Sequence, residues 1–168
     1  IKIDYMQNEG AFFDTNDYEL QKKKLGNGTY GSVYIANNVN NHKKYATKFI
    51  KIDNGFNGPQ QMLLIQKSSL ICKLKHPSIA KFVGVNFQSF TDPNKFEPSI
   101  MTKYCRHGSL KRVFDNEKKG IIDNNWTPTK KCISLLGISD ALRYLHQNGI
   151  VHHDLKPENV LIGRNYYP

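Results

Sequence analysis

A chain of 168 residues has the length of one ordinary domain, and its 39% of hydrophobic residues can form a buried core. This composition excludes a disordered chain, and no apolar run approaches the roughly 20 residues that a membrane-spanning helix needs. The 24 Lys and Arg residues outnumber the 14 Asp and Glu residues, which gives a net charge of +10. The lysines lie in short, separate clusters typical of solvated faces, so we expect no nucleic-acid partner.

Three cysteines, Cys72, Cys105 and Cys132, lie far apart and show no C-x-x-C spacing. Neither a disulfide framework nor a zinc site is indicated, so we expect a reducing, intracellular compartment such as the cytoplasm. The chain begins with Ile1 and has no signal-peptide pattern, which favours a fragment or a processed product. Oligomeric state cannot be predicted from these features.

The first half of the chain has strand character that is interrupted by one helix. Residues 1–17 are polar, and we expect a leader with little structure of its own. The alternation and turn signals then predict the following elements: strands at 18–25, 32–36 and 44–52, a turn at 37–41, a loop at 53–59 and a helix at 60–75. The helix should face inward with Leu64, Lys67, Ile71 and Leu74, and His76-Pro77 should end it.

The second half changes from strand to helix. Strands are predicted at 80–90 and 98–104, joined by a turn at 91–94. Thr127-Pro128 is typical of a helix start, Gly149 of a helix end, and Leu135, Leu142 and Leu145 should face inward. The order predicts an α+β fold, in which a small antiparallel sheet with one helix precedes a helical lobe.

A glycine-rich segment, G-x-G-x-x-G-x-V, runs from Gly26 to Val33 between two predicted strands. Glycines there allow backbone N–H groups to approach phosphate oxygens closely. A dinucleotide site is disfavoured because a strand rather than a helix follows Gly31. A glycine-rich hairpin turn without a ligand explains this segment equally well on its own.

Two further segments decide between these interpretations. Ala46-Thr47-Lys48 lies on the third predicted strand, and it resembles the lysine motif of protein kinases. Residues 152–159 read His-His-Asp-Leu-Lys-Pro-Glu-Asn after a long predicted helix, and this segment resembles the kinase catalytic loop. The chain therefore resembles eukaryotic protein kinases over residues 18–168.

The resemblance implies a two-lobe kinase fold with a polar leader at 1–17, a complete N-lobe at 18–104 and the beginning of the C-lobe at 105–168. The D-F-G metal-binding motif would come just after Pro168. The Lys-Pro-Glu-Asn loop, with residues 76–85 and 104–110, looks like the tyrosine-kinase-like group of Ser/Thr kinases. The implied activity is ATP-dependent phosphorylation of Ser or Thr in a protein substrate.

The resemblance also implies roles for single residues. At the phosphates, Gly26, Gly28 and Gly31 would form the cover, and Lys48 would hold the α- and β-phosphates. Around the adenine, Val33 and Ala46 would lie above the ring, Leu161 would lie below it, and Thr102 would be the gatekeeper. The Lys103 carbonyl and Cys105 amide would bind the adenine edge, and Ser109 would lie near the ribose. In catalysis, Asp154 would accept the substrate proton, Lys156 would neutralise charge on the γ-phosphoryl, and Asn159 would bind Mg²⁺. The implied cofactors are ATP and Mg²⁺.

Two positions depart from the family pattern. Lys67 stands where the family has a glutamate that pairs with the strand lysine, and no Asp or Glu occurs between Asn54 and Thr91. Like charges repel, so we expect Lys67 to turn away from Lys48. His153 replaces the catalytic-loop arginine. These departures keep a pseudokinase, acting as a nucleotide-binding or scaffold module, as the alternative, and residues 1–168 alone are expected to be inactive.

Overall fold

The computed structural model describes residues 12–28, 31–51, 58–121 and 124–163. Asp53, the acidic residue that is nearest to Lys48 in the sequence, belongs to the predicted loop at 53–59 and lies outside the described residues. The chain divides into two compact units, which we describe separately. One comprises Ile1–Lys75 and Lys81–Tyr104, and the other His76–Ala80 and Cys105–Pro168.

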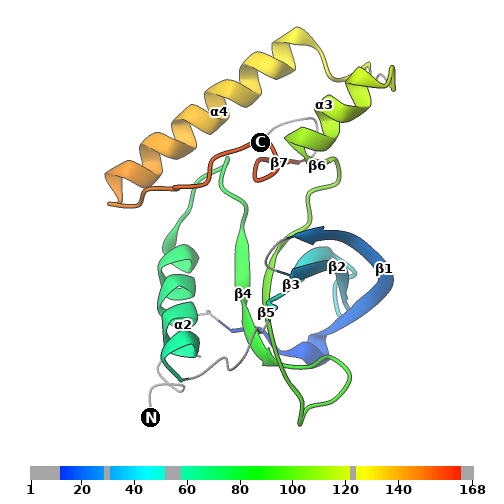
Figure 1. Cartoon of the computed structure of the whole chain (residues 1–168), viewed down its shortest axis with the longest axis vertical. Helices are drawn as coiled ribbons and strands as arrows, with labels where there is room; N and C mark the ends of the chain where they lie inside the picture. The colour runs from blue at the N-terminus through cyan, green and yellow to red at the C-terminus, as the bar shows by residue number, and fades with distance from the viewer. Residues whose placement is uncertain (1–11, 29–30, 52–57, 122–123, 164–168) are drawn as a thin grey trace. The chain divides into compact units, whose positions relative to one another are not determined.

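The first unit is a five-stranded antiparallel sheet with one long helix (Figure 1). The strand order is β1-β2-β3-β5-β4, so β4 lies at an edge. The helix α2 packs along β4. The elements are η1 (Thr15–Asp17), β1 (Tyr18–Gly28), β2 (Gly31–Asn38), β3 (Lys44–Phe49), α2 (Gly58–Lys73), β4 (Phe82–Gln88) and β5 (Phe96–Lys103). The predicted α+β arrangement of antiparallel sheet and single helix is confirmed.

The predicted turn between β2 and β3 forms around Asn38. Its side-chain oxygen accepts hydrogen bonds from the backbone N–H groups of Asn40 and Asn41, at 3.1 and 3.0 Å. Its own N–H donates to the carbonyl of Lys43 at 2.9 Å. Asparagine favours such turns because its short side chain can replace a backbone acceptor.

One face of the sheet carries an aromatic core. Phe13, Ala36 and Met101 are buried there, and Tyr18, Tyr45 and Phe90 are among the partly buried residues that pack against them. Paired residues on neighbouring strands point to the same face of a sheet, whereas successive residues along one strand point to opposite faces. The residues next to Ala36, Tyr45 and Met101 in β2, β3 and β5 therefore point to the face opposite the aromatic core.

Phe12 and Phe13 cover the edge of β4, so residues 12–17 are more ordered than the polar leader expected at 1–17, of which residues 1–11 lie outside the described residues. Phe12 forms a parallel bridge with Val85, and the Phe13 N–H donates to the Val85 carbonyl at 3.2 Å. The Asn86 side chain donates to the Phe13 carbonyl at 2.7 Å. An edge strand needs such a partner or cover because its unpaired backbone groups otherwise attract other chains.

Helix α2 buries a different face from the one that the sequence predicted. Its buried residues are Ile65 and Ser68, whereas Ile71 is 40% exposed. Lys67 is exposed, as the like-charge argument expects. The set Leu64, Lys67, Ile71 and Leu74 is therefore not the inward face. The helical spacing was correct, but several faces of this helix carry apolar residues, and spacing alone could not choose among them.

The second unit is mainly helical, with a two-stranded sheet whose strand β6 contacts α3. Its elements are β6 (Gly108–Ser109), α3 (Leu110–Lys118), α4 (Pro128–Gln147) and β7 (Leu161–Ile162). Its core contains Leu110, Val113, Trp126 and Ile162, with Ile138 of α4 packed against them. Helix α3 was not predicted, although Ser109 as a cap and the spacing of Leu110, Val113 and Phe114 could have indicated it.

Helix α4 begins and ends where the sequence predicts. The Thr127 hydroxyl accepts a hydrogen bond from the Lys130 N–H at 3.3 Å, and Pro128 occupies the first turn. Gly149 has a φ of +72°, which suits glycine after a helix end. The buried residues, however, are Ser134, Ala141 and Leu145, whereas Leu135 is 63% exposed. Leu135 therefore does not face the core of the described residues.

Residues 76–80 join the second unit through His76. Its Nδ1 accepts a hydrogen bond from the Ser78 N–H at 3.2 Å. Its Nε2 lies 2.9 Å from Asp140 Oδ2 on α4. The ring also packs against Tyr144 with 5.1 Å between centroids. These contacts explain why this short segment belongs with α4.

Candidate functional site

The predicted nucleotide residues of the first unit share one face of the sheet. Val33 on β2 is paired with Lys48 on β3, and Ala46 on β3 is paired with Thr102 on β5. Ala46 and Lys48 are two residues apart, so all four side chains point to the face opposite the aromatic core. All four are half-buried. The ammonium group of Lys48 thus shares this face with the small or apolar side chains of the other three residues. Such a surface suits a ligand that has a flat apolar part and an anionic part.

The predicted glycines lie at the β1–β2 end of the same sheet. Gly26 is paired with Val33, and Gly28 is paired with Gly31. Residues 29–30 of the motif lie outside the described residues. The pairing confirms that the described residues of the motif lie on two neighbouring antiparallel strands. Binding of phosphate by it stays a prediction.

Gly31 also has a requirement that comes from the fold. Its φ is +137°, and a Cβ atom built there would lie 1.8 Å from the Phe49 carbonyl oxygen of β3. A Cβ on Gly26 would meet nothing within 4 Å. Gly31 is therefore needed for β2 to approach β3, in addition to any role toward phosphate.

We expect Gly31→Ala to destabilise the protein by about 2 to 4 kcal/mol, from the positive φ and the backbone clash together. Gly26→Ala is the matched control and should change the free energy of unfolding by less than about 1 kcal/mol. Urea unfolding followed by circular dichroism measures both. Equal effects of the two substitutions would show that the close approach of β2 to β3 is unimportant.

Lys103 and Cys105 lie on either side of the boundary between the units. The Lys103 N–H donates to the Lys81 carbonyl at 2.8 Å, and the Cys105 carbonyl accepts from the Gly108 N–H at 3.2 Å. The predicted adenine contacts would instead use the Lys103 carbonyl and the Cys105 N–H group. These contacts stay predictions.

In the second unit, the three predicted catalytic residues are in direct contact. Lys156 Nζ lies 2.8 Å from Asp154 Oδ1. The Asn159 amide group donates to the other carboxylate oxygen, Oδ2, and to the Asp154 backbone carbonyl, both at 2.8 Å. All three residues are exposed. The loop therefore presents a fixed carboxylate, a cation and an amide to the solvent.

These contacts set the ionisation of Asp154. The hydrogen bond from Lys156, followed by that from Asn159, holds the pKa of the Asp154 carboxyl below its usual value. Both bonds favour the ionised form because a carboxylate accepts more strongly than a carboxylic acid. Asp154 is thus a carboxylate at neutral pH, suited to accept a hydrogen bond from a hydroxyl group and to orient it.

Helix α3, which the sequence analysis missed, anchors this loop. The N–H groups of Leu110 and Lys111 donate to the carbonyls of Val160 and Pro157, at 2.8 and 3.1 Å. The Arg112 N–H donates to the hydroxyl of Ser109 at 3.2 Å. The first N–H groups of a helix have no partner within it, so here they hold the loop instead. The loop geometry consequently depends on α3.

Ser109 and Leu161, both predicted to lie near the nucleotide, are paired in the β6–β7 sheet. Ser109 is half-buried, and its hydroxyl already caps α3 through the hydrogen bond to Arg112. Leu161 is also half-buried. The structure therefore brings these two residues together, and it gives Ser109 a structural role that the sequence analysis did not consider.

His153 has a φ of +58°, and the N–H of the following Asp154 donates to the His152 carbonyl at 2.8 Å. A tight turn at His153 therefore precedes the carboxylate. Histidine is among the residues that enter this left-handed region more readily than most. The replacement of the family arginine is compatible with the loop geometry.

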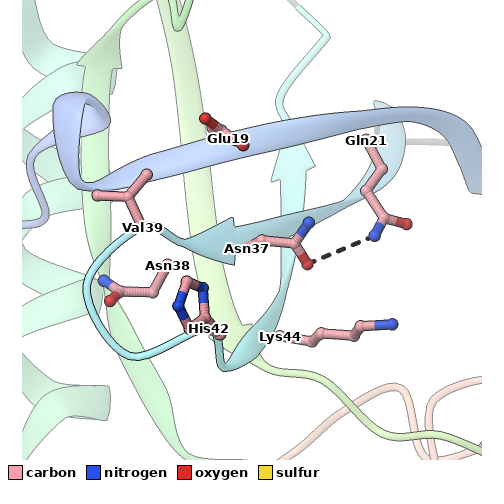
Figure 2. A pocket seen from close by; sticks show the side chains of 7 residues that line it. All are labelled: Glu19, Gln21, Asn37, Asn38, Val39, His42 and Lys44. Atoms are coloured by element: carbon pink, nitrogen blue, oxygen red, sulfur yellow. Dashed lines mark hydrogen bonds between the residues drawn. The ribbon is translucent and has the colours of Figure 1, made fainter.

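A polar hollow of about 380 Å³ lies at the other end of the β1–β2 hairpin from the glycines (Figure 2). Within it, the Gln21 amide donates to the Asn37 side chain at 3.4 Å. None of the predicted nucleotide or catalytic residues lines it. The residues around it are Glu19, Gln21, Asn37, Asn38, Val39, His42 and Lys44.

Comparison with known proteins identifies the family. Residues 19–167 match the family described as protein kinase domain. The chain belongs to the protein kinase family. The match covers both units and includes every residue of the predicted nucleotide and catalytic sets. Family membership confirms the kinase fold expected from the sequence and implies the use of ATP and a divalent metal ion.

Three relatives show the same relationship. Serine/threonine-protein kinase SSK22 of Saccharomyces cerevisiae is 34% identical over 142 residues, covering 84% of this chain and 10% of that protein. MAP kinase kinase kinase SSK2 of the same yeast is 32% identical and covers 84% and 8%. MAP kinase kinase kinase mkh1 of Schizosaccharomyces pombe is 31% identical and covers 85% and 12%. The chain thus matches only about a tenth of the length of these relatives.

The structure adds two findings about possible ligands and surroundings. In the described part of the chain, no three His, Cys, Asp or Glu side chains gather where they could hold a metal ion. No helix in that part is long and apolar enough to cross a membrane.

Proposed function

We propose that this protein kinase domain transfers the γ-phosphoryl group of ATP to the hydroxyl of Ser or Thr in a protein substrate, in an intracellular compartment. The observation that carries the proposal is the contact of Asp154 with both Lys156 and Asn159 in an exposed, anchored loop. The relatives named above as a Ser/Thr kinase and as MAP kinase kinase kinases support the choice of acceptor.

The side chains of the loop suit the metal that the family implies. The Asn159 amide nitrogen donates to two oxygen atoms of Asp154, which leaves its carbonyl oxygen as the ligand group. Oxygen ligands suit Mg²⁺, which proteins often hold through one or two side chains together with substrate phosphates. Mg²⁺ would neutralise charge on the phosphates.

The residues of this chain then divide the chemistry. Asp154, ionised and held by two neighbours, orients the substrate hydroxyl and accepts its proton. Lys156, which neutralises the Asp154 charge in this structure, places a cation beside the transferred group. Lys48, with Val33, Ala46 and Thr102 on the same sheet face, is proposed to hold the α- and β-phosphates and the adenine. The glycines would cover the phosphates from β1 and β2.

The acceptor can be tested directly in the full-length protein. We expect radiolabelled ATP with Mg²⁺ to label a generic basic protein substrate on Ser and Thr, as resolved by acid hydrolysis and separation of the phosphoamino acids. Label mainly on Tyr would contradict the proposed acceptor. Failure to transfer label, with retained ATP binding, would favour the pseudokinase alternative.

A further inference from the structure

Two exposed arginines of the second unit lie at a tight turn just before α3. The Gly108 N–H donates to the Cys105 carbonyl at 3.2 Å, which closes a turn with Arg106 in its second position. The Arg112 side chain lies against the end of this turn, because a Cβ atom built on Gly108 would be 3.2 Å from Arg112 Cδ and 3.5 Å from its Nη1. We call Arg106 and Arg112 the turn arginines.

The turn arginines carry positive charge that the described part of the chain does not neutralise. Within that part, neither guanidinium group forms an ion pair or a side-chain hydrogen bond. The neighbouring Lys111 differs, because its ammonium group donates to Asp115 at 2.6 Å. The sequence has no Asp or Glu between Glu97 and Asp115. The two guanidinium groups are therefore available to an anionic ligand.

The start of α3 is held against the catalytic loop. The Lys111 N–H donates to the Pro157 carbonyl at 3.1 Å, and β6 before α3 pairs with β7 after the loop (Figure 1). Pro157 follows Asp154 by only three residues, so backbone dimensions limit the distance between the Cα atoms of Asp154 and Lys111 to about 20 Å. An extended peptide crosses that distance in about six residues. A substrate with its hydroxyl at Asp154 can therefore reach the turn arginines.

The charges of the loop favour an acidic substrate at this place. Lys156 neutralises Asp154 at 2.8 Å, which leaves Glu158 as the other exposed carboxylate of residues 152–159. One carboxylate against two guanidinium groups leaves an excess of positive charge beside the loop. Guanidinium groups bind carboxylates and phosphates through charge-assisted, often paired, hydrogen bonds.

We propose that the turn arginines form a specificity site that binds an acidic side chain of the protein substrate, within about six residues of the Ser or Thr that is phosphorylated. The inference rests on the proposed function, because it names the substrates that this kinase domain prefers. The ligand group is an oxyanion, either the carboxylate of Asp or Glu or the phosphate of a residue that is already phosphorylated. The basic protein that tests the acceptor should accordingly be a weak substrate.

Peptides with a single serine test the proposal in the full-length protein with ATP and Mg²⁺. The peptides differ only at positions about three to six residues from the serine, which carry Asp, phosphothreonine, Asn or Lys. We expect kcat/KM for the Asp peptide to exceed that for the Lys peptide at least about tenfold at low salt, and the ratio to fall as salt screens the charges. Whichever of the Asp and phosphothreonine peptides is preferred identifies the source of the oxyanion.

Substitution of the turn arginines should remove this preference selectively. Arg106→Gln and Arg112→Gln should each lower the ratio of Asp to Lys peptide about threefold, and the double variant should bring it below about twofold. The rate with the Asn peptide should change less than about twofold, which separates recognition from folding and from phosphoryl transfer. Lys118→Gln is the matched control, because it removes an exposed cation of α3 about 9 Å along the helix from Arg112.

Two results would overturn the proposal. Equal kcat/KM values for the Asp and Lys peptides would show that no acidic side chain is recognised. An equal effect of Lys118→Gln and Arg112→Gln would show that net charge is sensed instead of the turn arginines. If no peptide is labelled, the proposed function fails, and fluorescence anisotropy of the same peptides still decides on this site. The Asp peptide must then bind more tightly than the Lys peptide, and Arg112→Gln must reduce the difference.

Discussion

Asp154→Asn is expected to reduce the rate of phosphoryl transfer by about 100- to 10,000-fold, the range associated with loss of a positioned general base. Asparagine is nearly isosteric, but it has no negative charge and cannot accept the hydroxyl proton. The substitution also removes the ion pair with Lys156, whose Nζ lies 2.8 Å from the carboxylate. We expect kcat to fall much more than the affinity for ATP, because the role proposed for Asp154 concerns the acceptor hydroxyl.

The measurement is steady-state kinetics of the full-length protein at saturating Mg²⁺, with ATP binding measured separately. Asp115→Asn provides a matched control because Asp115 is another aspartate of the second unit with an ion pair, to Lys111 in α3. Exposed ion pairs contribute little to stability, so this variant should keep activity within about twofold. Similar rates for wild type and Asp154→Asn would refute the proposed role of Asp154.

Phe13→Ala is expected to lower the free energy of unfolding by about 3 to 5 kcal/mol, the usual loss when a buried Phe is truncated. Phe13 is only 7% exposed. Its ring packs against Tyr18 and Phe90 with centroid distances of 5.7 and 6.0 Å, and it precedes the family match at residue 19. A protein that begins at residue 19 should therefore be less stable than one that includes Phe13.

Phe96→Ala is the control for this prediction, because Phe96 is 42% exposed and stacks on Phe87 at the surface. Its loss should cost less than about 1.5 kcal/mol. Thermal and urea unfolding of both variants separates burial from mere removal of an aromatic ring. If Phe13→Ala costs no more than Phe96→Ala, the cover over the β4 edge does not contribute to the stability of the sheet.

Patterns confined to neighbouring residues carried most of the correct predictions. The turn at Asn38 and the start of α4 at Thr127-Pro128 depend on hydrogen bonds between residues that are close in the chain. The segment 152–159 was singled out by its resemblance to the kinase catalytic loop, and in the structure Lys156 and Asn159 each contact Asp154, within six residues of chain. Helix α3 was missed, although its Ser109 cap was a local signal.

The sequence by itself determined the α+β class, the order of the elements and the residue types available for phosphoryl transfer. It could not determine which side of α2 or α4 is buried, because Leu63, Leu70 and Leu135 suit a core as well as Ile65 or Leu145 does. Only the tertiary structure decided these faces, the burial of Phe13 beneath residues more than 70 positions away, and the requirement for glycine at Gly31 beside Phe49. Burial and close approach depend on what other segments place opposite a residue, and periodicity within one segment does not contain that information.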